Sequence, residues 1–372
     1  MHFTYRTLAR NTGLGTRRFA YQIDGKPVPK AIRFRLWYRD NSININSLKC
    51  IPEDPIAKSI GDEVEEWSSY LEGDFMNLPF EQVNVFTDQL FQGNPLSVFW
   101  KLPPHFPDSL MQQLAREMNL SKTIFITVLP NEESHYTARI FTPEVELPFA
   151  GHPSMGGFFV LTQQGLVKQR AVQHGLAGST ALTMDDHGLI WLTPPPGQVD
   201  DSPIPIHEVA EALGAEVSWI SGNMPPILAG TGLFHLIVPL VIDQVSVLRP
   251  DRTKMRALGD KLGVTGIYVL ALSGPSAIHA RFFSLGMVIE EDSATGSAAS
   301  AFGTYLLKTT GTTAIQRYTI YQGVEIGRPS VLLVRLNAHG LGTLEVGGSV
   351  VRVLEGTVQI PDAKLDDVAE MA

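Results

Sequence analysis

The feature that most constrains the fold of this chain is an internal repeat. Residues 107–152 and 250–297 run through the same order: a Pro-Asp pair, an amphipathic helix, an apolar strand and a strand that begins with Ala-Arg. The arginines of the two Ala-Arg pairs are Arg139 and Arg281, at an offset of 142 residues. Self-similarity of this kind indicates two similar units in tandem. We therefore predict an α+β fold built from two pseudosymmetric halves.

The helices and strands of the repeat have recognisable boundaries. Asp108 opens the first repeated helix and Asp251 the second, and an aspartate there can cap a helix by accepting from its free N–H groups. Apolar or alternating segments predict strands over residues 123–129, 180–184, 189–193 and 266–272, and further strands between 319 and 360.

A Pro-rich connector over residues 194–205 separates the halves, since it shows neither helical nor alternating patterning. The predicted organisation is an N-terminal extension over 1–75, a first half over 76–195 and a second half over 196–372, with the C-terminal strands returning to the first half.

Charge separates a basic arm from an acidic body. The first 49 residues hold ten Lys and Arg but two acidic residues, whereas the whole chain carries a net charge of −9. So acidic a body is a poor partner for nucleic acid or an anionic membrane. We expect neither partner, and a cytoplasmic location. Three interpretations of the arm remain open: a mitochondrial targeting segment, a lineage-specific extension, or a translation start assigned too far upstream.

The chain contains one cysteine, Cys50. A single thiol excludes an internal disulfide, a four-thiolate zinc site and any mechanism that needs two thiols. We predict no metal site.

Candidate site residues lie at two helix starts, one in each half. Small residues open both helices, Gly151-His152-Pro153 in the first half and Thr295-Gly296-Ser297 in the second. Free N–H groups at such starts attract a carboxylate. The imidazole of His152 can carry a proton near neutral pH. Taken singly, each glycine could merely make a turn, His152 could be a satisfied core residue, and Asp292 could be a plain helix cap.

Taken together, these residues resemble the phenazine-biosynthesis PhzF-like isomerase family. The resemblance runs from about Met76 to near the C-terminus, and its most specific strings are Glu146–Pro153 and Glu291–Ser297. The other matching segments are Gln82–Asp88, Gly93–Pro95, Asn119–Ser121, Phe141–Pro143, Gln322–Gly323 and Gly327–Ser330.

The resemblance implies a fold like that of diaminopimelate epimerase, with a barrel-like sheet around a central helix in each half. It also implies an active site between the halves, no cofactor and a homodimer. The expected substrate is a small carboxylate, a cyclic amino-carboxylic acid such as dihydro-hydroxyanthranilate. The thiols of epimerase-type relatives are absent near Gly151 and Asp292, which excludes two-cysteine racemisation.

The resemblance also assigns roles to individual residues. His152 and Asp292 would assist proton transfer between carbon atoms of the substrate. The residues implied to bind the substrate are Ser121, Gly151, Thr295, Gly296 and Ser297. Ser293 departs from the pattern, because it stands where the family usually has proline, and this makes the loop entry less rigid.

Lys122 is the main departure from the family pattern, because it follows Ser121 where the isomerases carry glutamate. An ammonium is no base near neutral pH unless desolvation depresses its pKa, and Glu144, Glu146 or Asp292 would raise that pKa. We therefore interpret Lys122 as a charge clamp for an anionic substrate. An exposed lysine that favours the preceding helix dipole is the structural alternative.

Two functions follow from these residues. The first is a cofactor-independent isomerase of a small cyclic or amino-acid-derived carboxylate that uses Lys122, His152 and Asp292. The alternative is a catalytically inactive binding or scaffold protein of the same fold.

Overall fold

The computed structural model describes residues 75–361 apart from 104, 129–133, 221, 242, 286–289, 312 and 341, together with five short strands before residue 45. Contacts divide the chain into two units, Met1–Asp74 and Phe75–Ala372. The predicted extension over 1–75, Cys50 included, otherwise lies outside the described residues. The strands of the first unit are β1 (Phe3–Thr7), β2 (Phe19–Ile23), β3 (Lys26–Pro27), β4 (Trp37–Arg39) and β5 (Ser42–Asn44).

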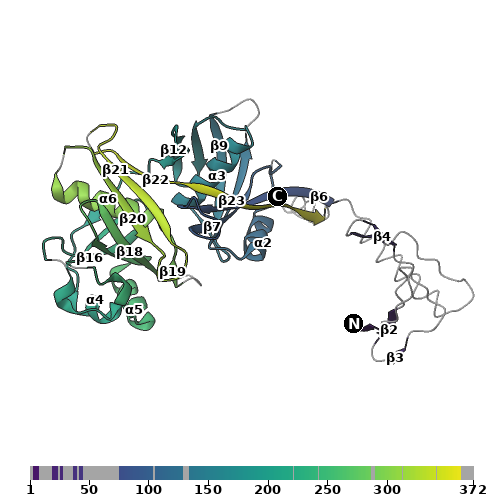
Figure 1. Ribbon diagram of the computed structural model, residues 1–372, viewed down its shortest axis with the longest axis horizontal. Helices are drawn as coiled ribbons and strands as arrows, with labels where there is room; N and C mark the ends of the chain where they lie inside the picture. Colours follow the sequence, from purple (N-terminus) through teal and green to yellow (C-terminus); the bar gives the residue numbers. More distant parts are fainter. Residues whose placement is uncertain are drawn as a thin grey trace, which may run out of the picture. The chain divides into compact units, whose positions relative to one another are not determined.

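The second unit contains both halves of the repeat (Figure 1). The elements of the first half are β6 (Phe75–Val85), β7 (Asn94–Phe99), α2 (Asp108–Met118), β8 (Lys122–Val128), β9 (His135–Phe141), β10 (Glu146–Leu147), α3 (Gly151–Gln163), β11 (Arg170–Gly175), β12 (Gly178–Met184) and β13 (Ile190–Leu192).

The second half repeats this order after an added strand and helix. Its elements are β14 (Gln198–Asp200), α4 (Ile206–Leu213), β15 (Ile227–Gly230), β16 (Phe234–Leu240), α5 (Arg252–Leu262), β17 (Gly266–Leu272), β18 (Ala277–Ser284), β19 (Glu291–Asp292), α6 (Gly296–Thr310), β20 (Gln316–Gln322), β21 (Ser330–Leu336), β22 (Leu344–Gly348) and β23 (Val350–Pro361). Short 3-10 turns cover Val217–Trp219 and Val245–Val247.

The two halves have the same strand pairing. β7 pairs with β8 in parallel as β16 does with β17, and β8 pairs with β9 antiparallel as β17 does with β18. β9 then pairs with β11 in parallel, as β18 does with β20. The predicted α+β fold of two pseudosymmetric halves is confirmed.

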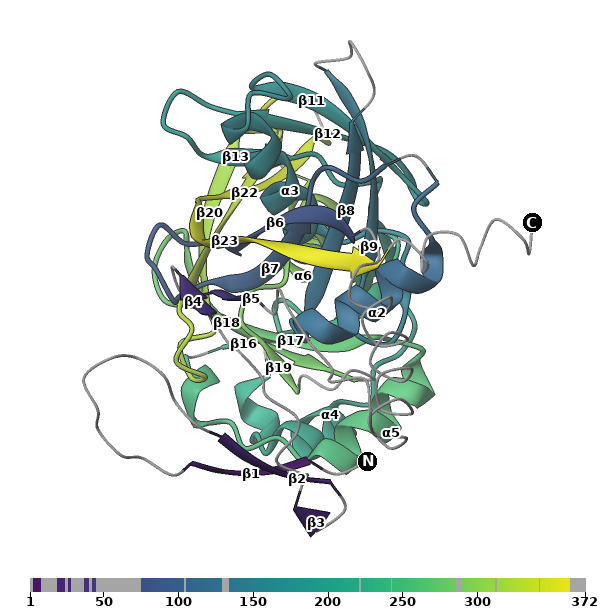
Figure 2. The ribbon, with the colours of Figure 1, turned by 90° about the vertical axis from the view of Figure 1, so that its right-hand side faces the viewer.

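The C-terminal strand β23 lies antiparallel to β6, in the first half (Figure 2). In the second half, β14 pairs antiparallel with β15, the counterpart of β6. The strand that flanks the first half therefore comes from the other end of the chain. β13 and β22 pair antiparallel and join the two halves into one continuous sheet system.

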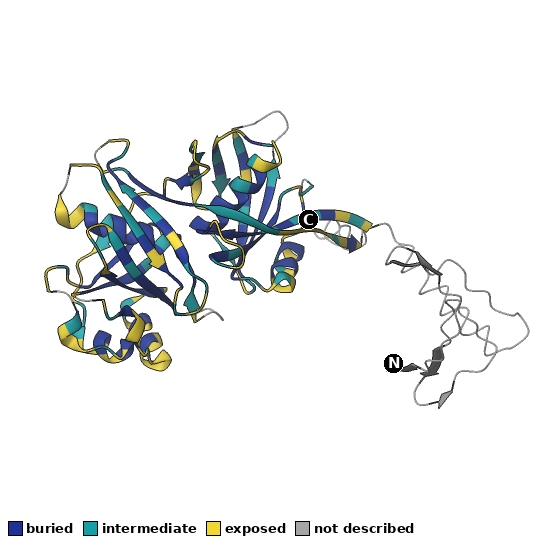
Figure 3. Ribbon diagram, viewed as in Figure 1, coloured by how far each residue is buried: buried dark blue, intermediate teal, exposed yellow. Residues whose placement is uncertain are grey.

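A buried helix lies inside each half (Figure 3). α3 packs on β6, β7, β8, β13 and β23, whereas α6 packs on β14, β15, β16, β21 and β22. Both helices are buried on most sides, and such helices are apolar nearly all round. The outer helices α2, α4 and α5 are amphipathic and bury one face only.

Glycines let α3 approach its sheet closely. A Cβ atom on Gly156 would lie 2.4 Å from Cδ2 of Leu96, inside the contact distance of two carbon atoms. Overpacking of this kind costs about 1–3 kcal/mol. We expect Gly156→Ala to lower the free energy of unfolding by about that amount in urea titrations. Gly222→Ala is the matched control, because a Cβ atom there meets nothing within 4 Å. Equal effects at the two positions would contradict this packing.

Two local predictions are corrected. Asp108 is the first residue of α2 and its side chain caps nothing, because it pairs with Arg139 instead. Asp251 does cap α5, accepting from N–H of Thr253 at 2.9 Å and of Lys254 at 3.1 Å. The connector over 194–205 was expected to be free of regular structure, but it contains β14, whose ladder with β15 satisfies its backbone groups.

Candidate active site

The N-termini of the two central helices meet. A Cβ atom placed on Gly151, the first residue of α3, would lie 3.7 Å from Cα of Gly296, the first residue of α6. Neither N-cap residue, Ala150 nor Thr295, forms a side-chain cap hydrogen bond. Both helix starts therefore keep backbone N–H groups and a positive dipole end for an anion. The two starts therefore face one another in direct contact.

Three ionisable side chains surround this meeting point. Lys122 opens β8, His152 lies in the first turn of α3, and Asp292 ends β19. Lys122 interacts electrostatically with both Asp292 and His152, so the structure brings the three predicted catalytic residues together. Lys122 is 8% exposed and His152 is 3% exposed.

Burial sets the protonation tendencies of the three groups. Desolvation lowers the pKa of Lys122, although the Asp292 carboxylate opposes this shift. Desolvation together with the charge of Lys122 holds the pKa of His152 well below its usual value, so its imidazole is neutral. Desolvation raises the pKa of Asp292, while Lys122 and hydrogen bonds from Thr295 and Asn94 act in the opposite direction. Within the described residues, Nε2 of His152 is buried and has no hydrogen-bond partner.

For Lys122, the structural alternative is excluded and one expectation is reversed. Lys122 is buried, so it is not an exposed residue at the C-terminus of α2. The expected rise of its pKa is also reversed, because desolvation outweighs the attraction of Asp292. Glu146 does not act on Lys122, since Arg139 donates to both of its carboxylate oxygens at 2.7 Å.

Asn94 links the two halves at this site, although it was not among the site residues predicted from the sequence. Its amide donates to Oδ1 of Asp292 at 2.7 Å and to the carbonyl of Ala294 at 2.8 Å. Its side-chain oxygen accepts from Ser121 at 3.1 Å. Asn94 therefore joins the residue before Lys122 to the carboxylate of Asp292. The available signal was its place in the Gly93–Pro95 segment.

Gln322 is a second missed residue. Its amide donates to the carbonyl of Asp292 at 2.8 Å and to Oγ1 of Thr295 at 3.1 Å. Thr295 in turn donates its hydroxyl proton to Oδ2 of Asp292 at 2.8 Å. Both carboxylate oxygens of Asp292 thus accept hydrogen bonds, which fixes their orientation.

Ser297, the remaining predicted binding residue, contacts a separate histidine. Nε2 of His235 lies 3.1 Å from Oγ of Ser297, and Nδ1 of His235 lies 3.1 Å from Oγ1 of Thr265. Burial lowers the pKa of His235 to about 4, so this imidazole is neutral. The side chain of Ser297 is therefore held inside the second half, which leaves its backbone N–H for a ligand.

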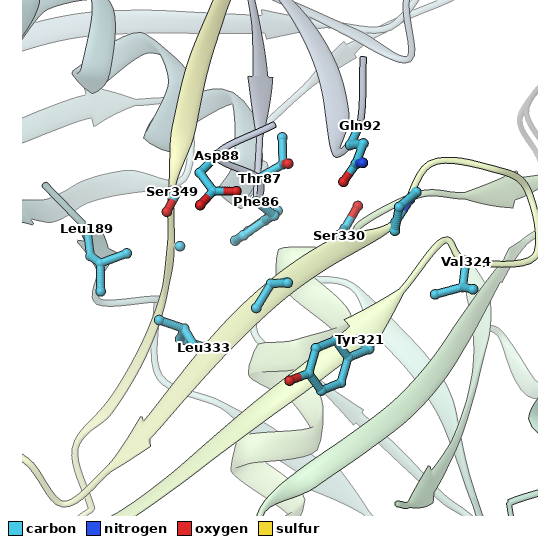
Figure 4. A pocket seen from close by; sticks show the side chains of 13 residues that line it. Phe86, Thr87, Asp88, Gln92, Leu189, Tyr321, Val324, Ser330, Leu333 and Ser349 are labelled. Atoms are coloured by element: carbon cyan, nitrogen blue, oxygen red, sulfur yellow. The ribbon is translucent and has the colours of Figure 1, made fainter. Parts of the chain in front are cut away.

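A cavity of about 220 Å³ lies near the junction of the halves (Figure 4). Its wall includes none of the predicted site residues, but it includes Phe86, whose ring tip lies 3.4 Å from a Cβ atom placed on Gly296. Phe86 has a φ of 65°, in the left-handed region that a phenylalanine rarely adopts. This aromatic ring therefore separates the cavity from the start of α6.

His279 forms a charged cluster outside the candidate site. Its Nδ1 lies 2.9 Å from Asp243 and its Nε2 lies 2.8 Å from Glu325. A histidine that donates to two carboxylates must carry both protons, and these bonds raise its pKa above the ordinary 6.5. The stabilisation is therefore complete below pH 6.5 and is lost as the pH rises through the higher folded-state pKa.

We expect His279→Gln to destabilise the protein most at low pH, with the difference shrinking as the pH rises above the folded-state pKa. Urea titrations from pH 5.5 to 9 measure that difference. His207→Gln is the matched control, since His207 is exposed and has no carboxylate partner among the described hydrogen bonds. A pH-independent effect of His279→Gln would contradict the charged cluster.

Comparison with known proteins identifies the class to which this fold and site belong. The chain resembles solved structures of PhzF-family phenazine biosynthesis proteins: one from Bacillus anthracis (TM-score 0.67, 21% identity, 76% of this chain and 99% of that chain) and one from Enterococcus faecalis (TM-score 0.61, 27% identity, 76% and 99%). A hydroxyproline epimerase from Agrobacterium vitis shares the fold at 14% identity, with a TM-score of 0.54, 77% of this chain and 93% of that chain. The class is that of isomerase-like enzymes with a diaminopimelate epimerase-like fold.

The family model described as phenazine biosynthesis-like protein (PhzC-PhzF) matches residues 83–356, and the chain belongs to this family. It is 33% identical over 288 residues to the trans-2,3-dihydro-3-hydroxyanthranilate isomerase of Pseudomonas fluorescens, covering 74% of this chain and 97% of the relative. It is 30% identical over 288 residues to antisense-enhancing sequence 1 of Schizosaccharomyces pombe, again with 74% and 97% coverage.

Membrane-spanning helices and metal-binding clusters are both absent from the described part of the chain. None of its helices is both long and apolar enough to cross a membrane. No group of three or more His, Cys, Asp or Glu side chains in the same residues is placed to hold a metal ion.

Proposed function

We propose that the protein is a cofactor-independent isomerase that moves a proton between carbon atoms of a small cyclic or amino-acid-derived carboxylate. The observation that carries the proposal is the contact of two uncapped helix starts at Gly151 and Gly296, beside the buried Lys122 and His152 and the partly buried Asp292. A carboxylate is the ligand that such N–H groups favour. The neighbouring groups supply the proton chemistry that an isomerase needs.

Each residue of the proposed site has a distinct role. Gly296 and Ser297 offer backbone N–H groups at the start of α6, and Gly151 offers its own at the start of α3. The N–H of Thr295 already donates to Oε1 of Gln322 at 3.4 Å, so Thr295 contributes its hydroxyl, which orients Asp292. Ser121 borders the site through its hydrogen bond to Asn94. His152 is placed to accept a proton, because its Nε2 has no partner among the described residues, although burial lowers the pKa of its imidazole and so weakens it as a base. Asp292 is suited to exchange one with the substrate, because burial raises the pKa of its carboxyl group above the ordinary value.

Lys122 distinguishes this protein from isomerases that carry glutamate at its position. We expect wild-type protein to convert trans-2,3-dihydro-3-hydroxyanthranilate poorly, because the group that shuttles the proton in such enzymes is replaced by an amine. Matched general acid–base catalysis is worth about 10² to 10⁴ in rate. Lys122→Glu should raise this conversion, measured by following substrate and product by liquid chromatography.

The control for that assay is Lys122→Gln, which removes the amine without supplying a carboxylate and should not raise the conversion. Wild-type turnover equal to that of the Pseudomonas relative would contradict the expectation. It would place the proton transfer entirely on His152 and Asp292.

A catalytically inactive binding protein remains the second proposal, favoured by the same observation at Lys122. In that case small carboxylates would bind at the helix starts and no proton exchange would occur. Calorimetric binding without turnover of any carboxylate would support this alternative.

A further inference from the structure

Lys122 has surroundings that are unusual for a lysine ammonium. It lies opposite Leu96 in the β7–β8 pairing and is more than nine-tenths buried. In the described part of the chain no hydrogen bond or ion pair within 4 Å holds its ammonium, although the charges of side chains as buried as this one are normally paired. Asp292 acts on it only as a nearby charge. Such a site favours the neutral, nucleophilic form of the amine.

The groups around Lys122 match the needs of carbonyl chemistry. Nε2 of His152 is a buried nitrogen with no described partner, and Lys122 lies close enough to act electrostatically on this imidazole. Asp292 is oriented by Asn94 and Thr295. The helix starts at Gly151 and Gly296 would hold a carboxylate next to these groups.

We propose that Lys122 forms an imine with the carbonyl carbon of a small 2-oxo carboxylate, and that this imine is the electron sink for proton transfer in the isomerase proposed above. The inference rests on that proposed function and names its substrate class. A carboxylate side chain at this position could not form such a bond, so the inference gives the lysine a chemical role of its own.

The reaction balances without any further reactant. The amine nitrogen of Lys122 bonds to the carbonyl carbon, and the oxygen leaves as water with the two amine protons. Once the imine nitrogen is protonated, it accepts the electron pair of an adjacent C–H bond while that proton passes to Nε2 of His152. In an unsaturated substrate, the proton returns at the far end of the conjugated enamine, and this moves the double bond. Water then hydrolyses the imine and restores the amine.

Reductive trapping tests this inference. Full-length protein is incubated with pyruvate and sodium cyanoborohydride near neutral pH, and the modified peptides are identified by mass spectrometry. We expect one adduct, at Lys122, and its loss in Lys122→Arg and in Lys122→Gln. Lys101→Arg is the matched control. Lys101 is an exposed lysine, so replacing it should leave the adduct at Lys122 unchanged. Circular dichroism checks that each variant is folded. The adduct on the wild-type protein is informative even if a variant fails to fold.

Two outcomes would overturn the imine: no adduct at Lys122, or modification of exposed lysines to the same extent. Deuterium exchange of carboxylate substrates by the wild-type protein is measured in parallel. Exchange without trapping would overturn the imine and leave the proposed function standing. Trapping without exchange of any carboxylate would support the imine and overturn the isomerase.

Discussion

Replacing Asp292 with asparagine is expected to lower the rate of proton transfer by about 10² to 10⁴-fold, the usual contribution of a positioned acid or base. Asparagine keeps an oxygen that can accept from Asn94, but its amide has no carboxyl proton to exchange with the substrate. The rate is measured on the substrate that the wild-type protein turns over best.

Ser121→Ala is the control for Asp292→Asn. It removes one hydrogen bond to Asn94 without touching the ionisable groups, and it should therefore reduce the rate far less. A rate for Asp292→Asn close to that of wild type would show that Asp292 is a structural residue. Thermal unfolding of both variants separates loss of catalysis from loss of fold.

Arg281→Met is expected to cost about 3–5 kcal/mol of stability, because it leaves the largely buried Glu291 carboxylate uncompensated. Arg281 donates to the two oxygens of Glu291 at 2.8 and 2.7 Å, and the two side chains are 10% and 12% exposed. Its guanidinium also lies 4.8 Å from the centre of the Phe283 ring. Urea unfolding at neutral pH measures the loss.

The repeat supplies a matched control for Arg281→Met. Arg139 binds Glu146 in the same two-bond geometry, but its side chain is 28% exposed and that of Glu146 is 22% exposed. Solvent screens this pair, so Arg139→Met should cost nearer 1 kcal/mol. Removing both charges in Arg281→Met with Glu291→Leu should recover much of the loss, because no unpaired charge remains. Equal costs at Arg139 and Arg281 would contradict the role of burial.

Much of the fold could be predicted from the sequence, because helical periodicity, apolar strands and the Ala-Arg pairs recur in both halves. The offset between Arg139 and Arg281 places two arginines in equivalent strands, and the structure gives both the same partner geometry. Helix periodicity located α2 and α5 but did not decide their caps. Asp108 does not cap α2, because its side chain pairs with Arg139, a residue 31 positions later. Such competition between partners depends on tertiary structure.

The candidate site was only partly accessible to sequence reasoning. His152 and Asp292 stood out because their residue types carry protons and because the surrounding strings are specific. Asn94 did not, since its contact with Asp292 joins residues 198 positions apart. The burial of Lys122 was also missed, because β8 begins one residue earlier than the predicted strand and so draws Lys122 into the sheet. A strand boundary of one residue thus decides whether the Lys122 side chain is exposed to solvent or buried.

Deuterium exchange between solvent and substrate tests the central claim most directly. Purified wild-type protein is mixed in D₂O with cyclic, amino-acid-derived and 2-oxo carboxylates, and proton NMR follows the loss of individual C–H signals. Proton transfer by His152 and Asp292 predicts exchange at one carbon of at least one carboxylate, and loss of that exchange in Asp292→Asn and in His152→Gln. No exchange in any carboxylate that calorimetry shows to bind, or exchange that persists unchanged in both variants, would contradict the claim.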